Sequence, residues 1–313
     1  MSKKPYLSIV IPCYNEAESL PQLYHEIQTA CDPLKKEYEI LFIDDGSTDG
    51  TFNLLRDLNK KDTRIKVIQF RKNAGKSDAL SVGFEAATGD LVVTMDADLQ
   101  DDPAEIPNLI AKLDNGYDMI SGWKKKRRDP LSKKIPSKVW NAMTTWMTGM
   151  RLHDYNCGLK IYRSEVIKTI RVFGELHRYL PVLADLQGFQ VGELPVNHRP
   201  RQFGKTKFGI SRFTNGFFDL LTVVFIHKYT KRPLHLFGLI GLVSTLLGSG
   251  ITLYLILLRI FKASYLSNRP LLFIGVMLLI LGVQFISIGL LGEMITRSSG
   301  STEKKSIRQT LGL

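Results

Sequence analysis

Cysteine is scarce in this chain, and several features that would place it in a specialised class are missing. Its three cysteines, Cys13, Cys31 and Cys157, show neither paired nor metal-ligand spacing, so a disulfide framework is not expected. The first residues, MSKKPYLSIVIP, pass into a strand-like run without an apolar helical region or a small-residue cleavage site, and we read no secretory signal there. Internal repeats and low-complexity linkers are not found either. The cysteines are therefore interpreted as ordinary buried thiols of a protein in a reducing compartment.

Two long apolar segments stand out against this background. Leu234 to Phe261 contains only His235 and Arg259 as ionisable residues, and Leu271 to Ile295 contains only Glu293. Each segment exceeds the roughly 20 residues that cross about 30 Å of hydrocarbon. The pattern predicts two transmembrane helices, and a buried helical hairpin is the alternative.

Basic residues flank both predicted spans. Lys228, Lys231 and Arg232 precede the first span, and four basic residues follow the second, whereas the connector holds Lys262 and Arg269. Two spans leave both flanking parts on the same side of the membrane. The positive-inside bias favours the cytosol for those parts, although the basic residues near the connector make the contrast imperfect.

The formal net charge of +12 is concentrated locally. The segment from Trp123 to Lys138 holds eight basic residues against a single acidic one, Asp129. Such a run can meet nucleic acid, anionic lipid or a phosphate substrate, or it can be a solvated loop. Because membrane spans occur in the same chain, lipid head groups and phosphate substrates are favoured, and we expect no nucleic-acid partner.

Short β-branched runs alternate with amphipathic stretches up to about residue 121. Such alternation predicts parallel strands joined by right-handed helical crossovers, with ligands bound beyond the carboxyl ends of the strands. The expected strands are Leu7 to Ile11, Tyr38 to Ile43, Ile65 to Phe70, Leu91 to Met95 and Tyr117 to Ser121, and the expected helices are Glu16 to Ala30, Thr48 to Lys60, Lys76 to Ala87 and Pro103 to Asp114.

Sequences rich in polar and charged residues follow the first four of these strands. They are Pro12 to Glu16, Asp44 to Ser47, Arg71 to Asn73, and Asp96 to Asp98. Asp44 and Asp45 can accept hydrogen bonds from a nucleotide base and ribose, while helix capping near Ser47 is the simpler alternative. The shared position of these sequences at one sheet edge predicts a nucleotide-sugar site.

The carboxylates after the fourth strand suit a metal. If the backbone stays extended, alternation places Asp96, Asp98 and Gln100 on one side, where oxygen ligands can hold Mg²⁺ or Mn²⁺ together with substrate phosphates. Asp101, Asp102 and Pro103 are expected to begin the next helix instead, since acidic residues and proline are favoured there.

The pattern is less regular from Leu152 onward. Asp154 to Arg163 predicts a turn feeding a strand, a helix is expected from Ser164, and Glu193 to Arg199 predicts another strand. Phe208 to Tyr229 shows apolar residues at mostly helical spacing. Such a helix can lie in the membrane interface or pack on the soluble domain, and periodicity does not distinguish the two.

Several motifs together resemble family 2 glycosyltransferases of the GT-A fold. The motifs are PCYNE, DDGSTDGT, N-x-G-K-x-x-A-L at Asn73, MDADLQDDP, and D-x-x-C-G-L-K-I-Y-R at Asp154. One head followed by two membrane helices is similar to the polyisoprenyl-phosphate glycosyltransferases, which include dolichyl-phosphate mannose synthase and bactoprenol glucosyltransferase. The resemblance covers essentially the whole chain.

The resemblance implies an α/β architecture with a Rossmann-like, mostly parallel sheet. A GT-A catalytic domain is expected over residues 1–207, amphipathic interfacial helices over 208–232, transmembrane helices over 233–261 and 270–296, and a loose cytosolic tail over 297–313. It also implies a multi-pass protein of the bacterial inner membrane with its catalytic domain in the cytosol. A homo-oligomer is expected, and small residues at Gly238, Gly241, Gly248 and Gly250 permit close helix approach between chains or within the pair.

The implied reaction is inverting, metal-dependent transfer of a single hexose to a polyprenyl phosphate such as undecaprenyl phosphate. Glucose from UDP-glucose is the expected donor, Mg²⁺ or Mn²⁺ the cofactor, and a GDP-mannose-dependent mannosyltransferase the nearest alternative. A processive polysaccharide synthase is disfavoured, because the chain lacks a Q-x-x-R-W motif and further spans. A non-catalytic membrane scaffold is the alternative of another class.

Site residues follow from the resemblance by position. Metal binding is implied for Asp98 and Gln100 with Asp96, and catalytic roles for Asp154 and Asp96. Asp154 can orient the acceptor, act as a weak base, or simply brace its loop. The acceptor phosphate already carries an anionic oxygen, so cations are needed more than a strong base. Substrate-binding residues are expected to be Pro12, Tyr14, Glu16, Asp44, Asp45, Lys76, Arg127, Arg201 and Lys205.

Overall fold

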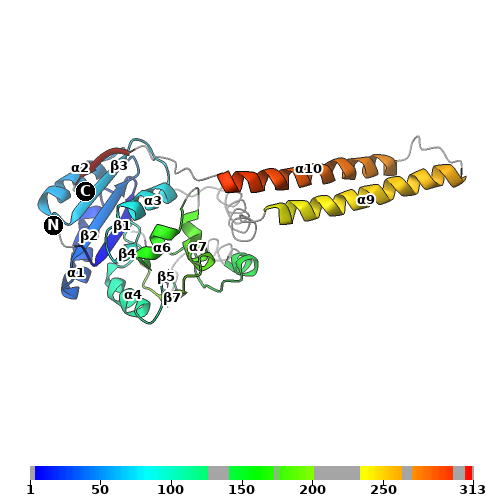
Figure 1. Cartoon of the computed structure of the whole chain (residues 1–313). Helices are drawn as coiled ribbons and strands as arrows, with labels where there is room; N and C mark the ends of the chain where they lie inside the picture. Colours follow the sequence, from blue (N-terminus) through cyan, green and yellow to red (C-terminus); the bar gives the residue numbers. More distant parts are fainter. Residues whose placement is uncertain are drawn as a thin grey trace. The chain divides into compact units, whose positions relative to one another are not determined.

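The computed structural model describes residues 4–125, 141–172, 174, 176–200, 233–262, 270–298 and 307–311. These residues belong to two units (Figure 1). The first unit, hereafter the head, spans Met1–Val223 together with Lys304–Leu313 and is built around a β-sheet. The second unit, Val224–Glu303, contains two long helices.

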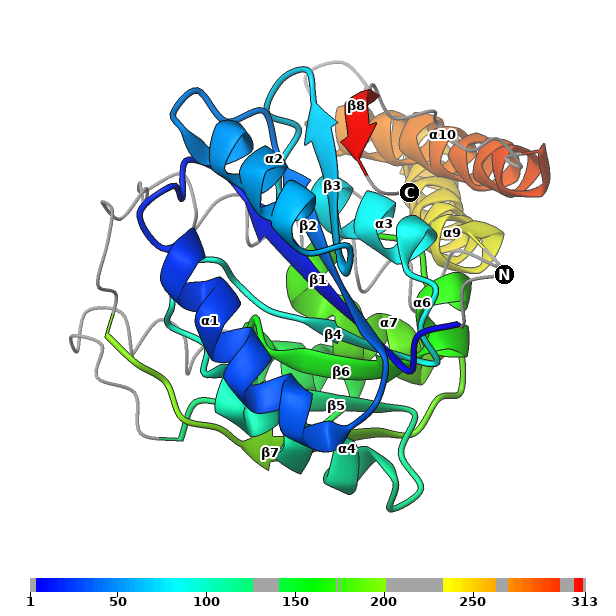
Figure 2. The ribbon, with the colours of Figure 1, turned by 90° about the vertical axis from the view of Figure 1, so that its left-hand side faces the viewer.

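The sheet of the head is mixed but mostly parallel in its central part. Its strand order is β7-β5-β6-β4-β1-β2-β3-β8 (Figure 2). β1 runs parallel to β2 and β4, β2 to β3, and β5 to β7, whereas β6 is antiparallel to β4 and β5. The strands are β1 Leu7–Cys13, β2 Tyr38–Asp44, β3 Ile65–Phe70, β4 Leu91–Thr94, β5 Met119–Trp123, β6 Lys160–Arg163, β7 Val191–Pro195 and β8 Ile307–Leu311.

Helices cover both faces of this sheet. On one face, side chains of α1, α2 and α4 join the main apolar core with Leu7, Ile9 and Ile11 of β1. On the other, α3 packs so closely that a Cβ on Gly83 would lie 2.3 Å from Val10, and α6 and α7 complete that layer (Figure 2). The helices are α1 Leu20–Cys31, α2 Thr51–Lys61, α3 Lys76–Ala86, α4 Ile106–Leu113, α6 Ser164–Thr169 and α7 Leu180–Leu186, with short 3₁₀ turns η1 Asp32–Leu34, η2 Pro103–Glu105 and η3 Leu176–Tyr179.

The predicted strand–helix alternation is confirmed up to β5. The strand and helix expected after Asp154 are also confirmed, as β6 and α6. The alternation did not reveal that β6 enters the sheet in the opposite direction. β7 begins at Val191, two residues before the expected strand.

One strand lies in a segment that the sequence suggested would be loose. β8 pairs antiparallel with β3, matching Val67 with Leu311 and Gln69 with Gln309. Without it β3 would be an edge strand with unpaired backbone groups, and β8 satisfies them. The Ser- and Lys-rich residues around β8 concealed a strand whose partner is distant in sequence.

The second unit pairs α9 Pro233–Lys262 with α10 Pro270–Ser298, and both helices are long and apolar enough to cross a membrane. Many of their apolar side chains are exposed, including Leu246 and Phe273, which a buried core hairpin would not show. A Cβ on Gly241 would lie 2.6 Å from the Gly282 carbonyl oxygen, so this glycine serves close packing within the pair. Gly248 packs in the same way against Gly275. The homo-oligomer therefore remains a prediction without support from these two glycines.

Candidate active site

The polar sequences predicted to meet do share one edge of the sheet. The carboxyl ends of the parallel strands β1, β2 and β4 lie there, and because β6 is antiparallel its amino end lies there as well. The loop from Asp154 to Leu159 consequently meets the segment that follows β4. The reversal of β6 therefore adds a fifth group of polar residues to the four that the sequence predicted at this edge.

The loops after β1 and β2 are bonded to each other. Asn15 adopts φ +56°. Its side-chain oxygen accepts a hydrogen bond from the backbone amide of Thr48 at 2.8 Å, and its backbone amide donates to the Ser47 hydroxyl at 2.9 Å. The Glu16 amide donates to the Thr51 hydroxyl at 2.9 Å. These bonds fix the half-buried side chains of Tyr14 and Glu16 beside the turn after β2.

Asp44 is fully buried, and protein groups bind both of its carboxylate oxygens. The Ser47 amide donates to one oxygen and the Gln69 side chain to the other, each at 3.0 Å. These bonds support the turn after β2. The helix capping near Ser47 that was the alternative is wrong, because α2 begins at Thr51 with Gly50 as its N-cap. A direct contact between Asp44 and a nucleotide stays a prediction.

Asp45 ties β2 to the loop that leads into α3. It accepts hydrogen bonds from the amides of Ala74 at 2.7 Å and Gly75 at 3.0 Å, and from the Asn73 side chain at 2.9 Å. Burial raises the pKa of Asp45 even against these donors. Asp45 thereby links the DDGS turn to the segment that carries Lys76.

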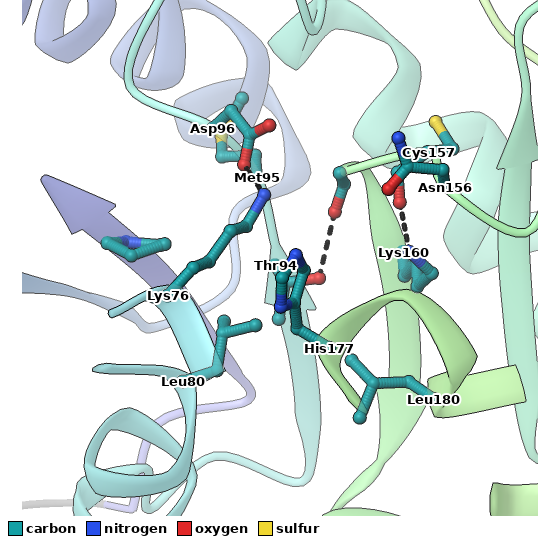
Figure 3. A pocket seen from close by; sticks show the side chains of 12 residues that line it. Lys76, Leu80, Thr94, Met95, Asp96, Asn156, Cys157, Lys160, His177 and Leu180 are labelled. Carbon is teal, nitrogen blue, oxygen red and sulfur yellow. Dashed lines mark hydrogen bonds and ion pairs between the residues drawn. The ribbon is translucent and has the colours of Figure 1, made fainter. Parts of the chain in front are cut away.

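Asp96 forms an ion pair with Lys76, the first residue of α3 (Figure 3). About a third of the Asp96 side chain is exposed. Burial by itself would raise the pKa of this carboxyl, but the positive charges of Lys76, Lys124 and Lys160 outweigh it and lower the pKa to about 2. Asp96 is therefore an ionised group at the mouth of the site.

The chain turns sharply after Asp96. Leu99 adopts φ +61°, and Asp98 accepts a hydrogen bond from the Gln100 amide at 3.1 Å. The premise of an extended backbone was therefore wrong, and side-chain alternation does not apply from Asp96 to Gln100. The Gln100 side-chain amide lies 3.5 Å from both the Arg199 carbonyl oxygen and the His198 ring. The metal-binding roles of Asp98 and Gln100 stay predictions.

The same turn separates Asp101 from Asp102. Asp102 caps η2 by accepting from the Ala104 amide, as expected for a helix start. Asp101 instead turns back to accept the Asp96 amide at 3.2 Å and is 2% exposed, so its expected role was wrong. Burial and the charges of Asp96 and Asp98 raise its pKa to about 6, against the opposing charge of Lys124.

The loop before β6 lies directly on these carboxylates. A Cβ on Gly158 would lie 2.6 Å from an Asp101 oxygen and 2.8 Å from an Asp96 oxygen, so only glycine fits there. The Thr94 hydroxyl donates to the Gly158 carbonyl at 3.0 Å (Figure 3). Asp154, at the other end of the loop, is 2% exposed and accepts the Asn156 amide at 3.0 Å.

Two lysines at this edge were not singled out by sequence reasoning. Lys160 is 3% exposed and donates to the Cys157 carbonyl (Figure 3), and burial lowers its pKa to about 8. Burial would also lower the pKa of Lys124, but Cys157, Asp101 and Asp154 raise it. Lys124 lies within a basic run in which no single residue stood out, and Lys160 lies in a segment that was predicted only as a strand.

The oxygen donors at this edge suit a hard divalent cation shared with substrate. Among the residues that the structure describes, no three His, Cys, Asp or Glu side chains are placed to enclose an ion by themselves. Mg²⁺ is commonly held by one or two carboxylates and completed by substrate phosphates and water. Asp98 and Asp96 fit that arrangement, and the close approach of Gly158 leaves no side chain between Asp96 and Asp101.

Three predicted phosphate-binding residues, Arg127, Arg201 and Lys205, lie outside the described residues, and so does the predicted interfacial segment 208–232. The described chain reaches Arg199, whose guanidinium binds Glu26 at 2.7 Å and Asp102 at 2.6 Å. Arg199 therefore anchors the start of the segment that holds two of the three cations.

The sequence profile described as Glycosyl transferase family 2 matches residues 8–171, which include the segments after β1, β2 and β4 and the loop before β6. The chain belongs to glycosyltransferase family 2. A dodecaprenyl-phosphate galacturonate synthase of Rhizobium johnstonii is 38% identical over 297 residues, which cover 93% of this chain and 88% of that protein. The family resemblance is confirmed, and the protein is an enzyme of the glycosyltransferase class rather than a non-catalytic scaffold.

Solved structures of other glycosyltransferases share the fold. A mannosyltransferase from Pyrobaculum calidifontis, solved with GDP-Man and Mn²⁺, has a TM-score of 0.52 at 17% identity and covers 96% of this chain and 77% of its own. A glucosyl-3-phosphoglycerate synthase from Mycobacterium tuberculosis, solved with Mg²⁺ and UDP, has a TM-score of 0.54 at 17% identity, covering 71% and 79%. The predicted GT-A-like fold is confirmed.

Proposed function

We propose that this glycosyltransferase moves one hexose from a nucleoside diphosphate to a polyprenyl phosphate, with inversion at C1. The observation that carries the proposal is the meeting of Asp96, Asp101 and the Asp154–Gly158 loop at one sheet edge. The acceptor class is supported by the 38% identical dodecaprenyl-phosphate galacturonate synthase and by two helices apolar enough to span a bilayer. A lipid acceptor explains why a head of this fold carries such helices.

On the donor side, we assign nucleotide contacts to Pro12, Tyr14, Glu16 and the Asp44–Asp45 pair. Pro12 lines the same small cavity as Lys76 and Asp96, which supports its place beside the donor. Asp44 supports the turn from within, and Asp45 holds the loop that presents Lys76. Lys76 binds Asp96 in the structure and would be shared with the donor diphosphate or ribose.

On the metal side, Asp98 is the principal ligand, with Gln100 and Asp96 beside it. A bound Mg²⁺ or Mn²⁺ supplies positive charge that offsets the charge developing on the departing diphosphate. Asp98 is 8% exposed and fixed by the Gln100 amide, so its position is set before any ligand arrives. Such preorganisation avoids reorganisation during the reaction.

In the transfer step, an anionic oxygen of the lipid phosphate attacks C1, the bond from C1 to the diphosphate oxygen breaks, and the nucleoside diphosphate leaves. Because the nucleophile is already deprotonated, Asp154 needs only to orient the acceptor or act as a weak base. Lys124 lies close enough to Asp154 and Asp101 for their charges to raise its pKa. We assign phosphate binding to Arg127, Arg201 and Lys205 on sequence grounds.

The sugar is the least constrained part of the proposal. Glucose from UDP-glucose is our first choice, as the family resemblance implies, at the cytosolic face of a bacterial inner membrane. The name of the Rhizobium relative adds galacturonate as a second candidate. The nearby cations Lys76 and Lys160 favour testing it, because a buried lysine can pair with a sugar carboxylate.

The test uses the purified full chain with undecaprenyl phosphate and radiolabelled UDP-glucose, UDP-galacturonate or GDP-mannose, each with and without Mn²⁺. We expect label to enter the organic phase with one UDP-sugar and to require the cation. Label in the organic phase with GDP-mannose alone would replace the donor assignment. Hydrolysis of nucleotide sugar without any lipid product would overturn the acceptor class.

A further inference from the structure

A short helix beside the candidate acceptor loop has its polarity reversed. Residues 141–148 are helical, and the hydroxyl side chains Thr144 and Thr148 face the protein with 0% and 8% exposure. Trp146 points outward and is 83% exposed. A helix on a water-exposed surface normally shows the opposite arrangement, with apolar residues inside and hydroxyls outside.

Trp146 stands out in the head as a whole. Among the described residues of that unit it is the one large apolar side chain that is exposed, while the other exposed large apolar residues lie in α9 and α10. Ala142 is exposed beside it, and Met143 and Met147 are half-buried. We call Ala142, Met143, Trp146 and Met147 the Trp146 face.

This helix is bonded to the loop that carries Asp154. The Thr145 hydroxyl lies 3.1 Å from the Tyr155 hydroxyl, which donates to the Met150 carbonyl at 2.6 Å. The Asn141 side chain donates to the His153 carbonyl at 2.7 Å. Tyr155 is 3% exposed and follows Asp154 directly, so whatever holds the Trp146 face also positions Asp154.

Basic residues near the Trp146 face favour an anionic membrane as its binding partner. Arg151 is exposed just beyond the helix, and the basic run from Trp123 to Lys138 precedes it in sequence. Anionic lipid head groups attract such basic segments, and tryptophan is enriched where apolar and wet surroundings meet. The same chain carries two helices that are long and apolar enough to cross a bilayer, and such helices would tether the head to a membrane.

We propose that the Trp146 face inserts into the head-group region of an anionic bilayer and thereby fixes Asp154 at the level of the acceptor phosphate. Insertion of the Trp146 face concerns a surface of the head and holds for any acceptor. The positioning of Asp154 at the acceptor phosphate rests on the proposed function. Insertion of this face would hold the head in one orientation on the membrane.

Fluorescence quenching tests the insertion in the full chain. The protein is reconstituted in vesicles of phosphatidylcholine and phosphatidylglycerol with or without brominated acyl chains. The chain has a third tryptophan, Trp140, so the measurements use a Trp140→Phe background. In that background we expect brominated lipid to quench the fluorescence, and the further change Trp146→Phe to remove most of the quenching. Trp123→Phe is the control, because Trp123 stacks on His153 with ring centroids 4.1 Å apart and should not report lipid.

Two quenching results would overturn the proposal. Quenching of Trp146 by acrylamide but not by brominated lipid would mean that the face meets water. Protection from both quenchers would mean that protein covers it, either residues 208–232 of the same chain or a second copy. Crosslinking from a cysteine placed at position 142 then identifies that protein.

Kinetics test the coupling to the acceptor. In anionic vesicles we expect Trp146→Ala to raise KM for undecaprenyl phosphate several-fold with little change in KM for the nucleotide sugar, and Trp146→Phe to restore much of the loss. Equal changes in both KM values would refute the positioning role. If the wild type transfers no sugar to lipid, the proposed function fails while the quenching result still decides membrane insertion.

Discussion

The two edges of the same sheet differ in how closely their acidic side chains lie to one another. At the amino edge, Glu39 of β2 is 4% exposed and accepts hydrogen bonds from Ser8 at 2.5 Å and from the Thr88 amide at 2.9 Å. Lys66 adds an ion pair at 2.8 Å. Burial would raise the pKa of Glu39, but these partners outweigh it and lower the pKa.

At the carboxyl edge, acidic groups crowd together instead. Asp96, Asp98 and Asp101 lie within six residues of sequence, and the pKa values of Asp96 and Asp101 are driven apart, to about 2 and about 6. An edge that served stability alone would separate or fully pair such groups. Asp96 is paired with Lys76, whereas burial and the neighbouring Asp96 and Asp98 raise the pKa of Asp101. A cation bound at this edge would relieve the repulsion among these carboxylates, and carboxylates with shifted pKa values are frequent at functional sites.

Asp98→Ala should produce the largest effect, because it removes the carboxylate that we assign to the metal. We expect kcat to fall by about 10²–10³-fold, the scale seen when one preorganised electrostatic group is lost. Radiolabelled sugar transfer to lipid at saturating Mn²⁺ measures it. Asp57→Ala, at a carboxylate on α2 whose side chain is 58% exposed, is the control and should behave as wild type. Full activity of Asp98→Ala would remove Asp98 from the reaction.

Gly158→Ala should rank second. The added methyl group would lie within 3 Å of both Asp96 and Asp101, so the Asp154 loop or the carboxylates must move. A displacement on the order of 1 Å can cost about 10²-fold in rate. The same assay measures it, and Gly50→Ala is the matched control, since its new Cβ would meet only Ala17 at 3.9 Å. Equal rates for the two variants would show that the loop does not set the geometry.

Lys66→Met tests whether the ion pair at the amino edge serves stability rather than activity. It leaves the buried Glu39 carboxylate without its cation and should cost roughly 1–3 kcal/mol of stability. Specific activity per folded molecule should be unchanged, because the change lies at the opposite edge. Thermal unfolding followed by near-ultraviolet circular dichroism provides the stability measurement. A loss of activity larger than the loss of folded protein would mean that the two edges are coupled.

Glu39 should contribute to the loss of stability at acidic pH. Its pKa is lower in the folded protein than in the unfolded chain, where it is about 4.3. The associated stabilisation is therefore fully present above the unfolded value and is lost as the pH falls through the folded value. Glu39→Gln should weaken the dependence of the unfolding midpoint on pH over this acidic range. An unchanged slope in the variant would show that Glu39 does not contribute to acid unfolding.

Arg199→Lys should have the smallest effect. Arg199 binds Glu26 and Asp102 with two separate nitrogens, and its amide donates to the Gln100 carbonyl at 2.9 Å. Lysine keeps the charge but loses this fork, so we expect a few-fold rise in KM for the lipid acceptor with kcat nearly unchanged. Arg56→Lys on α2 is the control. A change in kcat alone would place Arg199 in the chemical step instead.

Much of this site could be foreseen because local patterns specify it. Short β-branched runs followed by polar and acidic residues located β1, β2 and β4 and the groups at their ends. The contributions of Asp101, Lys124 and Lys160 could not be foreseen. Asp101 depends on the left-handed turn at Leu99, Lys160 on the position of β6 beside β4, and Lys124 on the position of β5 beside β6.

The family, the strand–helix alternation and the two apolar helices could be read from the amino-acid sequence, because each follows from residue types at short spacing along the chain. The folded structure was needed to show that β6 runs antiparallel, that β8 returns to pair with β3, and that Gly158 lies against Asp96 and Asp101. These features join segments that lie about 60 to 240 residues apart. Such contacts form because packing and hydrogen bonding are satisfied across the whole sheet, and no local pattern of residues encodes that condition.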